Sequence, residues 1–320
     1  MQTTWGWLPA IYLFLGGLGA GSFLVAALME WTGEQYKRDF CPTALVGSTV
    51  GGPLLLLGTV LLIFDLGAGL REPWRIFLMF THFRSVMTWG VWILSLFIPL
   101  CFLYGFLELM ELYPRVWRGL FMRRFPPLRR LPLRKIKHWV AGVGSLFAVG
   151  TAIYTGVLLS AVGPSIPFWS TPIASWLRIP MLPVLFVVSA ISTGMGLTID
   201  LSATLALPSI HQMLKKLPAI HLALIGLEAV LIGVLLLVAM EQGGAAAQSA
   251  VFIMTGSVSI TFWVGVVLLG LVYPFVVHAY AVGAGRHSLA SGLGSGAGIV
   301  IAGMFLRYII IASGIPTALQ

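Results

Sequence analysis

Charge and cysteine are both scarce in this chain. Asp, Glu, Lys and Arg together make up 9% of its 320 residues, and its two cysteines are Cys41 and Cys101. Ordinary soluble domains carry about 25% charged residues, so this composition leaves no room for a soluble catalytic domain. An iron–sulfur cluster needs about four cysteine thiolates, so we expect neither a cluster nor a metal–sulfur site in this chain.

Apolar residues take the place of charge. Hydrophobic residues make up 58% of the chain and the mean hydropathy is +0.98, values typical of a protein that crosses a membrane several times. A helix needs about 20 apolar residues to cross a hydrocarbon core of about 30 Å. Eight segments meet this requirement: Leu8–Trp31, Thr43–Gly69, Val86–Leu109, His138–Val162, Met181–Leu207, Ala219–Glu241, Val258–Val282 and Ser291–Ile315.

These segments predict an all-α integral membrane fold, in which residues 1–320 form one domain with eight transmembrane helices. The runs LGGLGAGSF in the first segment and SAISTGMGL in the fifth are both rich in small residues. This likeness suggests two related four-helix halves, residues 1–162 and 173–320. Small residues also let helix backbones approach closely in lipid, so tight packing explains the same runs without a repeat.

Basic residues lie mostly on one side of the predicted membrane. The loops after the odd-numbered segments hold 14 Lys and Arg residues, nine of them between Arg115 and Lys137, whereas the opposite loops hold four. Because Lys and Arg are enriched in cytoplasmic loops, we expect both termini to be periplasmic, in the cytoplasmic membrane of a bacterium or archaeon. Contact with anionic lipid also explains the basic loop, so we expect no nucleic-acid binding.

The segment Asp65–Trp92, DLGAGLREPWRIFLMFTHFRSVMTWGVW, is the most informative part of the chain. It places two acids, three arginines and a histidine between two apolar stretches. Charge at the edge of a membrane helix is costly and is usually retained for function. We therefore expect a functional site at this edge of the membrane.

Four polar side chains from distant segments share one predicted depth. At a rise of 1.5 Å per residue, Tyr154 and Arg307 each lie about 24 Å from the cytoplasmic start of their segments. Asp65 lies at the periplasmic end of the second segment, and Tyr12 lies about 6 Å below the periplasmic start of the first. Hydrogen-bond donors beside an ionisable group suit a quinone head group, whose carbonyls need donors and whose redox reaction moves two protons. Alternatively, the tyrosines belong to an interfacial aromatic belt, and the acid and the arginine form a structural pair.

A second polar set lies deeper in the predicted bilayer. Glu228 falls near the middle of the sixth segment, and Asp200 and His221 lie near the cytoplasmic ends of the fifth and sixth. A carboxylate at such a depth is neutral or paired, and the three residues could form part of a proton route from the cytoplasmic face. A buried hydrogen bond for Glu228 and an interfacial position for Asp200 explain the pattern equally well.

Two other functions are compatible with parts of the sequence. His221 and His278 lie on different predicted helices, and such a pair could ligate a b-type haem, although haem ligands usually lie deeper. Eight helices and a repeat would also be compatible with a secondary transporter. Transporters often have a helix broken at mid-depth in both halves, and no segment clearly carries that signal.

Four stretches resemble the NrfD-like membrane subunits of the polysulfide reductase family. They are WGWLPAIYLFLGGLGAGSFL in the first segment, DLG…PWR…F…RSVMTWGVW from Asp65, YTGVLLS from Tyr154 and LRYIIIASG from Leu306. The resemblance covers nearly the whole chain. It implies an eight-helix subunit without its own haem or iron–sulfur cluster, which binds menaquinone or ubiquinone near the periplasmic face. It also implies a ferredoxin-like partner subunit with several 4Fe–4S clusters and, beyond it, a molybdenum or tungsten catalytic subunit or a cytochrome.

The resemblance also assigns residues by position. Tyr154 matches the quinone-site tyrosine of the family, and Asp65 stands where polysulfide reductase has a glutamate. The chain departs from the family on the first helix, where Tyr12 stands in place of a histidine that contacts the quinone. The details of head-group contact and proton exchange can therefore differ from those of the family.

Together these observations predict a quinone-reacting membrane anchor of a respiratory oxidoreductase, which does not act alone on the terminal substrate. We expect quinol to give two electrons to the iron–sulfur partner while its protons leave through Asp65 or through the periplasmic loop that follows it. Tyr12 and Tyr154 would donate hydrogen bonds to the quinone carbonyls, and Arg307 and Arg71 would tune Asp65.

The loop between the second and third segments is the expected docking surface for the iron–sulfur subunit. It mixes charge with an apolar run, which suits a partly buried protein contact. The expected docking residues are Trp74, Arg75, His82 and Arg84.

Overall fold

The computed structural model describes residues 6–32, 37–65, 73–113, 132–174, 176–205, 210–284 and 289–317. Within these ranges the chain is almost entirely helical, and eight helices are long and apolar enough to cross a membrane. They are α1 (Trp7–Thr32), α2 (Lys37–Asp65), α4 (Val86–Leu112), α6 (Leu133–Ser160), α7 (Met181–Thr204), α8 (Ile210–Gln242), the continuous pair η5 (Thr261–Val272) and α10 (Tyr273–Ala284), and α11 (Leu289–Ala312). The predicted eight-helix membrane fold is confirmed.

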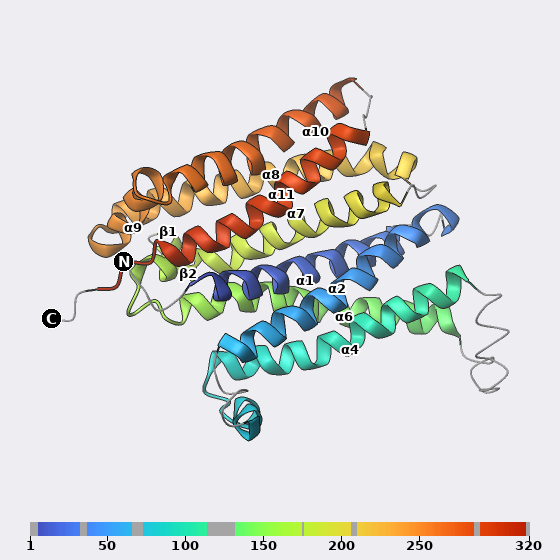
Figure 1. Ribbon diagram of the computed structural model, residues 1–320, viewed down its shortest axis with the longest axis horizontal. Coiled ribbons are helices and arrows are strands. Elements are labelled where there is room, and N and C mark those ends of the chain that lie inside the picture. Colours follow the sequence, from blue (N-terminus) through green and yellow to red (C-terminus); the bar gives the residue numbers. More distant parts are fainter. Residues whose placement is uncertain are drawn as a thin grey trace.

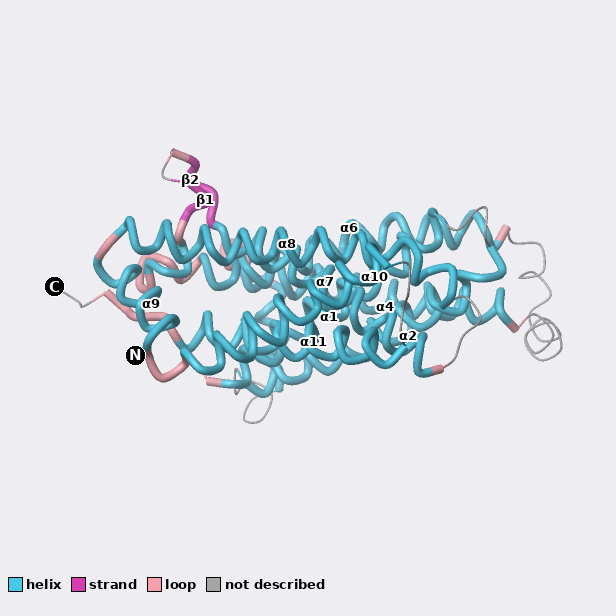
Figure 2. The backbone as a smooth tube through the Cα atoms, turned by 90° about the horizontal axis from the view of Figure 1, so that it is seen from above, coloured by secondary structure: helices cyan, strands magenta, loops and turns pink. Residues whose placement is uncertain are grey.

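The long helices lie side by side in two groups of four (Figure 1, Figure 2). The first group is α1, α2, α4 and α6, and the second group is α7, α8, η5–α10 and α11. α1 is central, because it contacts α2 and α6 in its own group and α7 and α11 in the other. α1 begins and α11 ends at the same end of the bundle, which we name the terminus end. The opposite end is named the far end.

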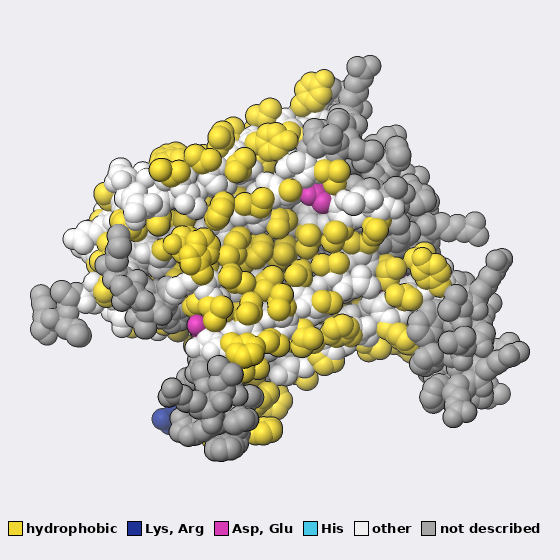
Figure 3. Space-filling view, viewed as in Figure 1, with side chains coloured by type: hydrophobic (Ala, Val, Ile, Leu, Met, Phe, Trp, Pro, Cys, Tyr) yellow, Lys and Arg dark blue, Asp and Glu magenta, His cyan; other side chains and the backbone are white. Residues whose placement is uncertain are grey.

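Glycines set the distance between the two groups. A Cβ built at Gly21 of α1 would collide with the backbone of Ala190 in α7, and one at Gly194 of α7 would collide with the backbone of Gly21. Such backbone contacts are typical of helices that pack in lipid. The visible outer face of the bundle is mainly hydrophobic, with few charged groups, as a lipid-facing surface requires (Figure 3).

Several short elements that the sequence did not predict connect the long helices. η2 (Pro73–Phe80) precedes α4, and η4 (Pro167–Ser170) follows α6. An antiparallel hairpin of β1 (Pro172–Ala174) and β2 (Leu177–Pro180) then leads into α7. Figure 2 shows that this hairpin projects sideways from the terminus end.

The connection after α8 also differs from the prediction. A short apolar helix, α9 (Gly244–Thr255), follows a turn in which Gly243 and Gly244 have φ angles of 70° and 57°, a region that favours glycine. The seventh span begins at Thr261 as a π-helix rather than at Val258.

Candidate functional site

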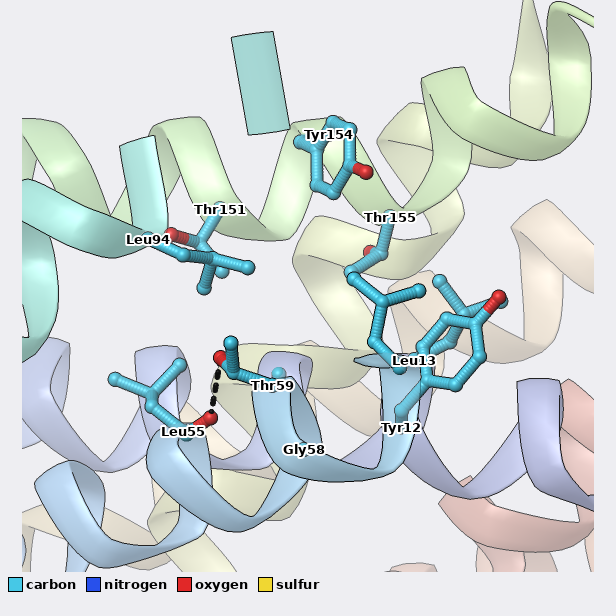
Figure 4. A pocket seen from close by; sticks show the side chains of 11 residues that line it. Tyr12, Leu13, Leu55, Gly58, Thr59, Leu94, Thr151, Tyr154 and Thr155 are labelled. Atoms are coloured by element: carbon cyan, nitrogen blue, oxygen red, sulfur yellow. Dashed lines mark hydrogen bonds between the residues drawn. The ribbon is translucent and has the colours of Figure 1, made fainter. Parts of the chain in front are cut away.

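A narrow cavity lies near the terminus end of the first group, between α1, α2, α4 and α6 (Figure 4). We name it the tyrosine pocket. Its lining consists of four leucines and two glycines, together with two tyrosines and three threonines. The lining residues are Tyr12, Leu13, Gly16, Leu55, Gly58, Thr59, Leu62, Leu94, Thr151, Tyr154 and Thr155. An apolar cavity with a few polar groups is typical of a small-molecule site.

The structure brings Tyr12 and Tyr154 together in this pocket, from α1 and α6. Both side chains are buried, with exposed fractions of 8% and 7%. The Tyr154 hydroxyl has no hydrogen-bond partner among the described residues, and the Tyr12 phenol interacts electrostatically with Tyr154 and Asp65. A buried polar group without a partner costs about 1–3 kcal/mol. A ligand that accepts a hydrogen bond from Tyr154 would remove this cost.

The three threonines of the pocket already use their hydroxyl hydrogens. Thr59, Thr151 and Thr155 each donate to a backbone carbonyl three or four residues earlier in their own helix, at 2.7 to 2.9 Å. A hydroxyl has one hydrogen, so these oxygens can only accept a further bond. Tyr12 and Tyr154 are therefore the side chains in the lining that can donate to a ligand.

Asp65 lies beside the tyrosine pocket rather than in its lining. It is the last residue of α2, three residues after the lining residue Leu62, and its side chain is exposed. It is near enough to interact electrostatically with Tyr12. Arg71, its expected partner, lies outside the described residues.

The expected docking residues are described only in part. Trp74 and Arg75 lie in η2, but their side chains are outside the described part of the structure. His82 and Arg84 follow η2 and are exposed. The His82 ring is held by the Leu78 carbonyl, 3.1 Å from its Nδ1. Their role in docking stays a prediction.

Arg307 lies apart from the tyrosine pocket and belongs to the second group. Its Nη1 donates to the Ser189 hydroxyl at 3.0 Å and to the Gly303 carbonyl at 2.9 Å. Its Nη2 faces Gly17 of α1, where an added Cβ would lie 2.9 Å away. The expected grouping of Arg307 with Asp65 is therefore not the arrangement in the structure, because the guanidinium contacts Ser189 and Gly303 of the second group and lies over the Phe14 and Phe186 rings.

A series of buried polar contacts begins at Arg307. The Glu228 carboxylate on α8 accepts hydrogen bonds from Ser189 and Ser192 of α7, and it is attracted to Arg307. Arg307 and the two serines are fully buried, and Glu228 is 7% exposed. The buried cation and carboxylate are thus linked through the Ser189 hydroxyl.

The series of contacts continues through two histidines. The Ser192 hydroxyl lies 3.5 Å from Nε2 of His221. The His221 ring lies 4.7 Å from the His278 ring, between centres. Nε2 of His278 then lies 3.1 Å from the Ser295 hydroxyl on α11.

Asp200 of α7 lies at the far end of this series of contacts. It accepts a hydrogen bond from the backbone N–H of Ala297, and a Cβ at Gly296 would collide with its carboxylate. Ser295 and Arg307 are 12 residues apart on α11, so the contacts extend over about 18 Å of a hydrocarbon core of about 30 Å. We name this set the polar row: Arg307, Ser189, Glu228, Ser192, His221, His278, Ser295 and Asp200.

Part of the polar row could be predicted from the sequence. Glu228, Asp200 and His221 were expected to lie together, whereas the serines and the link to Arg307 were not predicted. Buried serines give no distinct signal in a membrane helix, because small residues are common wherever helices touch.

His221 and His278 are not arranged to hold a haem. Their rings contact one another directly, and each Nε2 lies near a serine hydroxyl, so no macrocycle fits between them. In the described part of the chain, no three or more His, Cys, Asp or Glu side chains are grouped to hold a metal ion.

An ion-pair cluster closes the far end of the first group. Lys137 of α6 lies 2.7 Å from Glu30 of α1 and 3.3 Å from Glu108 of α4, and it also pairs with Glu111. His138 Nδ1 lies 3.4 Å from Glu30. Lys137 was predicted to be a loop cation, but the residue is 4% exposed and lies within α6. We name these residues the Lys137 cluster.

Buried aromatic residues separate the Lys137 cluster from the tyrosine pocket. Phe23, Phe97 and Tyr104 are fully buried, and the Phe23 ring lies 5.3 Å from Phe97 and 5.2 Å from Tyr104. They pack with Cys101 and aliphatic neighbours in one hydrophobic core. We name these three residues the aromatic layer.

Known proteins are similar to this chain over most of their length. A family model described as "Polysulphide reductase, NrfD" matches residues 1–318. A polysulfide reductase subunit of Wolinella succinogenes is 32% identical over 319 residues, which cover 97% of this chain and 94% of that protein. Protein NrfD of Escherichia coli is 28% identical over 334 residues, with coverage of 97% and 94%. A protein NrfD homolog of Haemophilus influenzae is 26% identical over 292 residues, with coverage of 86% and 83%. The protein therefore belongs to the polysulphide reductase NrfD family.

Proposed function

We propose that this protein is the quinone-reacting membrane subunit of a respiratory oxidoreductase complex, and that the tyrosine pocket is its quinone site. The observation that carries the proposal is the Tyr154 hydroxyl, which is buried in the pocket without a partner in the described structure. A quinone carbonyl accepts hydrogen bonds, and Tyr12 and Tyr154 are the donors in the lining. Membership of a family that includes a polysulfide reductase subunit supports the same assignment.

Oxidation of a bound quinol, menaquinol or ubiquinol, releases two electrons and two protons. In this proposal Asp65 accepts protons at the terminus end, because it is an exposed carboxylate within electrostatic reach of Tyr12. Arg71, six residues further along the chain, would keep this carboxylate charged and ready to accept a proton.

The electrons would pass to a ferredoxin-like iron–sulfur subunit docked at the terminus end, and from there to a molybdenum or tungsten subunit or a cytochrome. The docking surface would include Trp74, Arg75, His82 and Arg84. Changing Trp74 and Arg75 together should release the iron–sulfur subunit from membranes while this chain stays inserted. If the iron–sulfur subunit is released only when the basic residues between Arg115 and Lys137 are changed, it docks on the opposite face of the membrane.

We also propose that the polar row carries protons. Its carboxylates, histidines and serines can each donate and accept in turn, and its Arg307 end lies against Gly17, the neighbour of the pocket residue Gly16. In proteoliposomes, Glu228→Gln should slow proton exchange with the far side and leave quinone affinity unchanged. Unchanged proton exchange would mean that the row is structural.

A secondary transporter is the alternative with less support. Each of the eight spans in the described ranges is a continuous helix, whereas transporters often bind their substrate where helices are broken near mid-bilayer.

Quinone binding to the purified protein in nanodiscs tests the main proposal. Tyr154→Phe removes one donor and should weaken binding of a menaquinone analogue by about 0.5–1.5 kcal/mol. Tyr104→Phe is a matched control, because this buried hydroxyl donates to the Ala26 carbonyl at 3.4 Å, outside the pocket; affinity should not change. If Tyr154→Phe binds as tightly as the unchanged protein, the tyrosine pocket is not the quinone site.

A further inference from the structure

Gly90 of α4 lies directly against the ring of Tyr154. Gly90 is buried, and a Cβ built on it would overlap the tyrosine, since its three nearest atoms would be Cζ, Cε1 and Cε2 of that ring. The ring therefore occupies the volume in which any other residue would place its side chain. The contact joins α4 to α6 at the level of the tyrosine pocket.

Packing against Gly90 determines where the Tyr154 hydroxyl lies. That hydroxyl is buried and has no hydrogen-bond partner in the described ranges, so no polar contact within those ranges holds it. Figure 4 shows the Tyr154 ring on the opposite side of the pocket from α2 and its Thr59. A side chain at position 90 would push the ring away from α4 and move the hydroxyl with it.

We propose that Gly90 is a positioning residue of the quinone site, which acts by leaving room for the Tyr154 ring. This inference rests on the proposed function of the tyrosine pocket. Gly90 offers no side chain to a ligand, and its effect passes through the donor hydroxyl. Because hydrogen bonds weaken steeply with distance and angle, a small displacement of the ring is enough to lose the bond.

The Gly90 contact differs from the glycine contacts that join helices. At Gly21, Gly156 and Gly194 the nearest atoms to an added Cβ belong to the backbone of a neighbouring helix, so these glycines set helix spacing. At Gly90 the three nearest atoms belong to one side chain. Gly144 of α6 makes the same kind of contact away from the pocket, because the atoms nearest to its added Cβ belong to the Phe23 ring.

The test compares three Gly→Ala variants of the full-length protein in nanodiscs. Gly90→Ala displaces Tyr154, Gly144→Ala displaces Phe23, and Gly142→Ala adds a methyl group where no atom lies within 4 Å. The measurements are the Kd of a menaquinone analogue and the midpoint of thermal unfolding. We expect Gly90→Ala to raise the Kd about ten-fold, the scale of one lost hydrogen bond. Gly144→Ala should lower the unfolding midpoint without changing the Kd. Gly142→Ala should neither raise the Kd nor lower the unfolding midpoint.

Two double variants connect the effect to Tyr154. In the Tyr154→Phe background, Gly90→Ala should change the Kd by less than about two-fold, because the donor is already absent. Gly90→Ala with Tyr154→Leu removes the steric overlap, so it should regain any yield or thermal stability that Gly90→Ala loses. If that combination stays as unstable as Gly90→Ala, contact with Tyr154 is not the cause and the inference is wrong.

The outcomes separate this inference from the proposed function. If Tyr154→Phe leaves the Kd unchanged, the tyrosine pocket does not bind quinone through this donor, and the proposed function fails. If Tyr154→Phe weakens binding but Gly90→Ala does not, the pocket stands and Gly90 does not position the donor. Equal loss of affinity in Gly90→Ala and Gly144→Ala would also overturn the inference, because the effect would then be general destabilisation.

Discussion

Arg307 on α11 donates a hydrogen bond to the Ser189 hydroxyl on α7, 3.0 Å away. The same serine donates to Glu228 on α8. One hydroxyl thus joins a buried guanidinium to a buried carboxylate across three helices. Removal of either charge would leave the other buried without its counterion.

Arg307→Met should therefore destabilise the protein by about 3–5 kcal/mol, the usual cost of removing one partner of a buried ion pair and leaving the other charge unpaired. The double variant Arg307→Met with Glu228→Gln should recover much of this loss, because no charge is then left alone. Unfolding of the purified protein in mixed detergent micelles measures both. Arg84→Met is the control, since Arg84 is exposed. Equal instability of the single and double variants would show that charge pairing is not the cause.

Asp65→Asn keeps the shape of the side chain and removes its basic site. If Asp65 accepts quinol protons, quinol-driven turnover of the complex should fall by about 10²-fold or more, the scale of a lost general base. Activity of the soluble partners with an artificial electron donor should not change. Glu241→Gln is a matched control, because Glu241 is an exposed acid near the end of α8. Normal turnover of Asp65→Asn would assign proton release to another group.

Lys137→Met should destabilise the first group, because Glu30 and Glu108 would lose the cation that they share. We expect a loss of about 3–5 kcal/mol in the same unfolding assay. Glu111→Gln should cost far less, since Glu111 is 48% exposed and exposed pairs contribute about 0–1 kcal/mol. Quinone affinity should stay unchanged in both variants, because the aromatic layer separates the cluster from the pocket. A lower quinone affinity in Lys137→Met but not in Glu111→Gln would indicate that α6 couples the Lys137 cluster to the tyrosine pocket.

Membrane orientation can be tested with fusions. A reporter that is active only in the cytoplasm should work after Arg124 and fail at the C-terminus. Without the buried Lys137, 13 of the Lys and Arg residues counted from the sequence lie on one predicted side and four on the other. A reporter that is active only in the periplasm should give the opposite result. If the two patterns are exchanged, the tyrosine pocket lies near the cytoplasmic face.

The sequence was sufficient to predict the spans because they depend on local properties. Length and hydropathy place the ends of the eight spans within five residues of their positions in the structure, although the helices α2 and α8 begin six and nine residues before their predicted segments. The fixed helical rise also gives depth, which is why Tyr12 and Tyr154 could be assigned to one level before their positions were known.

Depth along a helix does not determine the direction in which a side chain points, so the sequence did not predict which side chains meet. Arg307 has the same predicted depth as Tyr154, but it points into the second group, because rotation about a helix axis is set by packing with neighbours. Gly16 and Gly17 are adjacent on α1, but Gly16 lines the tyrosine pocket whereas Gly17 faces the Arg307 guanidinium. Sequence could not reveal Gly90 as the partner of Tyr154 either, because glycines are frequent throughout membrane helices.

The aromatic layer has a consequence for the movement of charge across the membrane. Phe23, Phe97 and Tyr104 are fully buried and pack together across the middle of the first group, so a charge that crossed the membrane through this group would have to pass an apolar layer, where desolvation is costly. Moving one charge across the full potential involves about 2.3 kcal/mol per 100 mV. In the second group, a charge that moved along the polar row would cross part of this potential, with a cost or gain set by its sign and its direction.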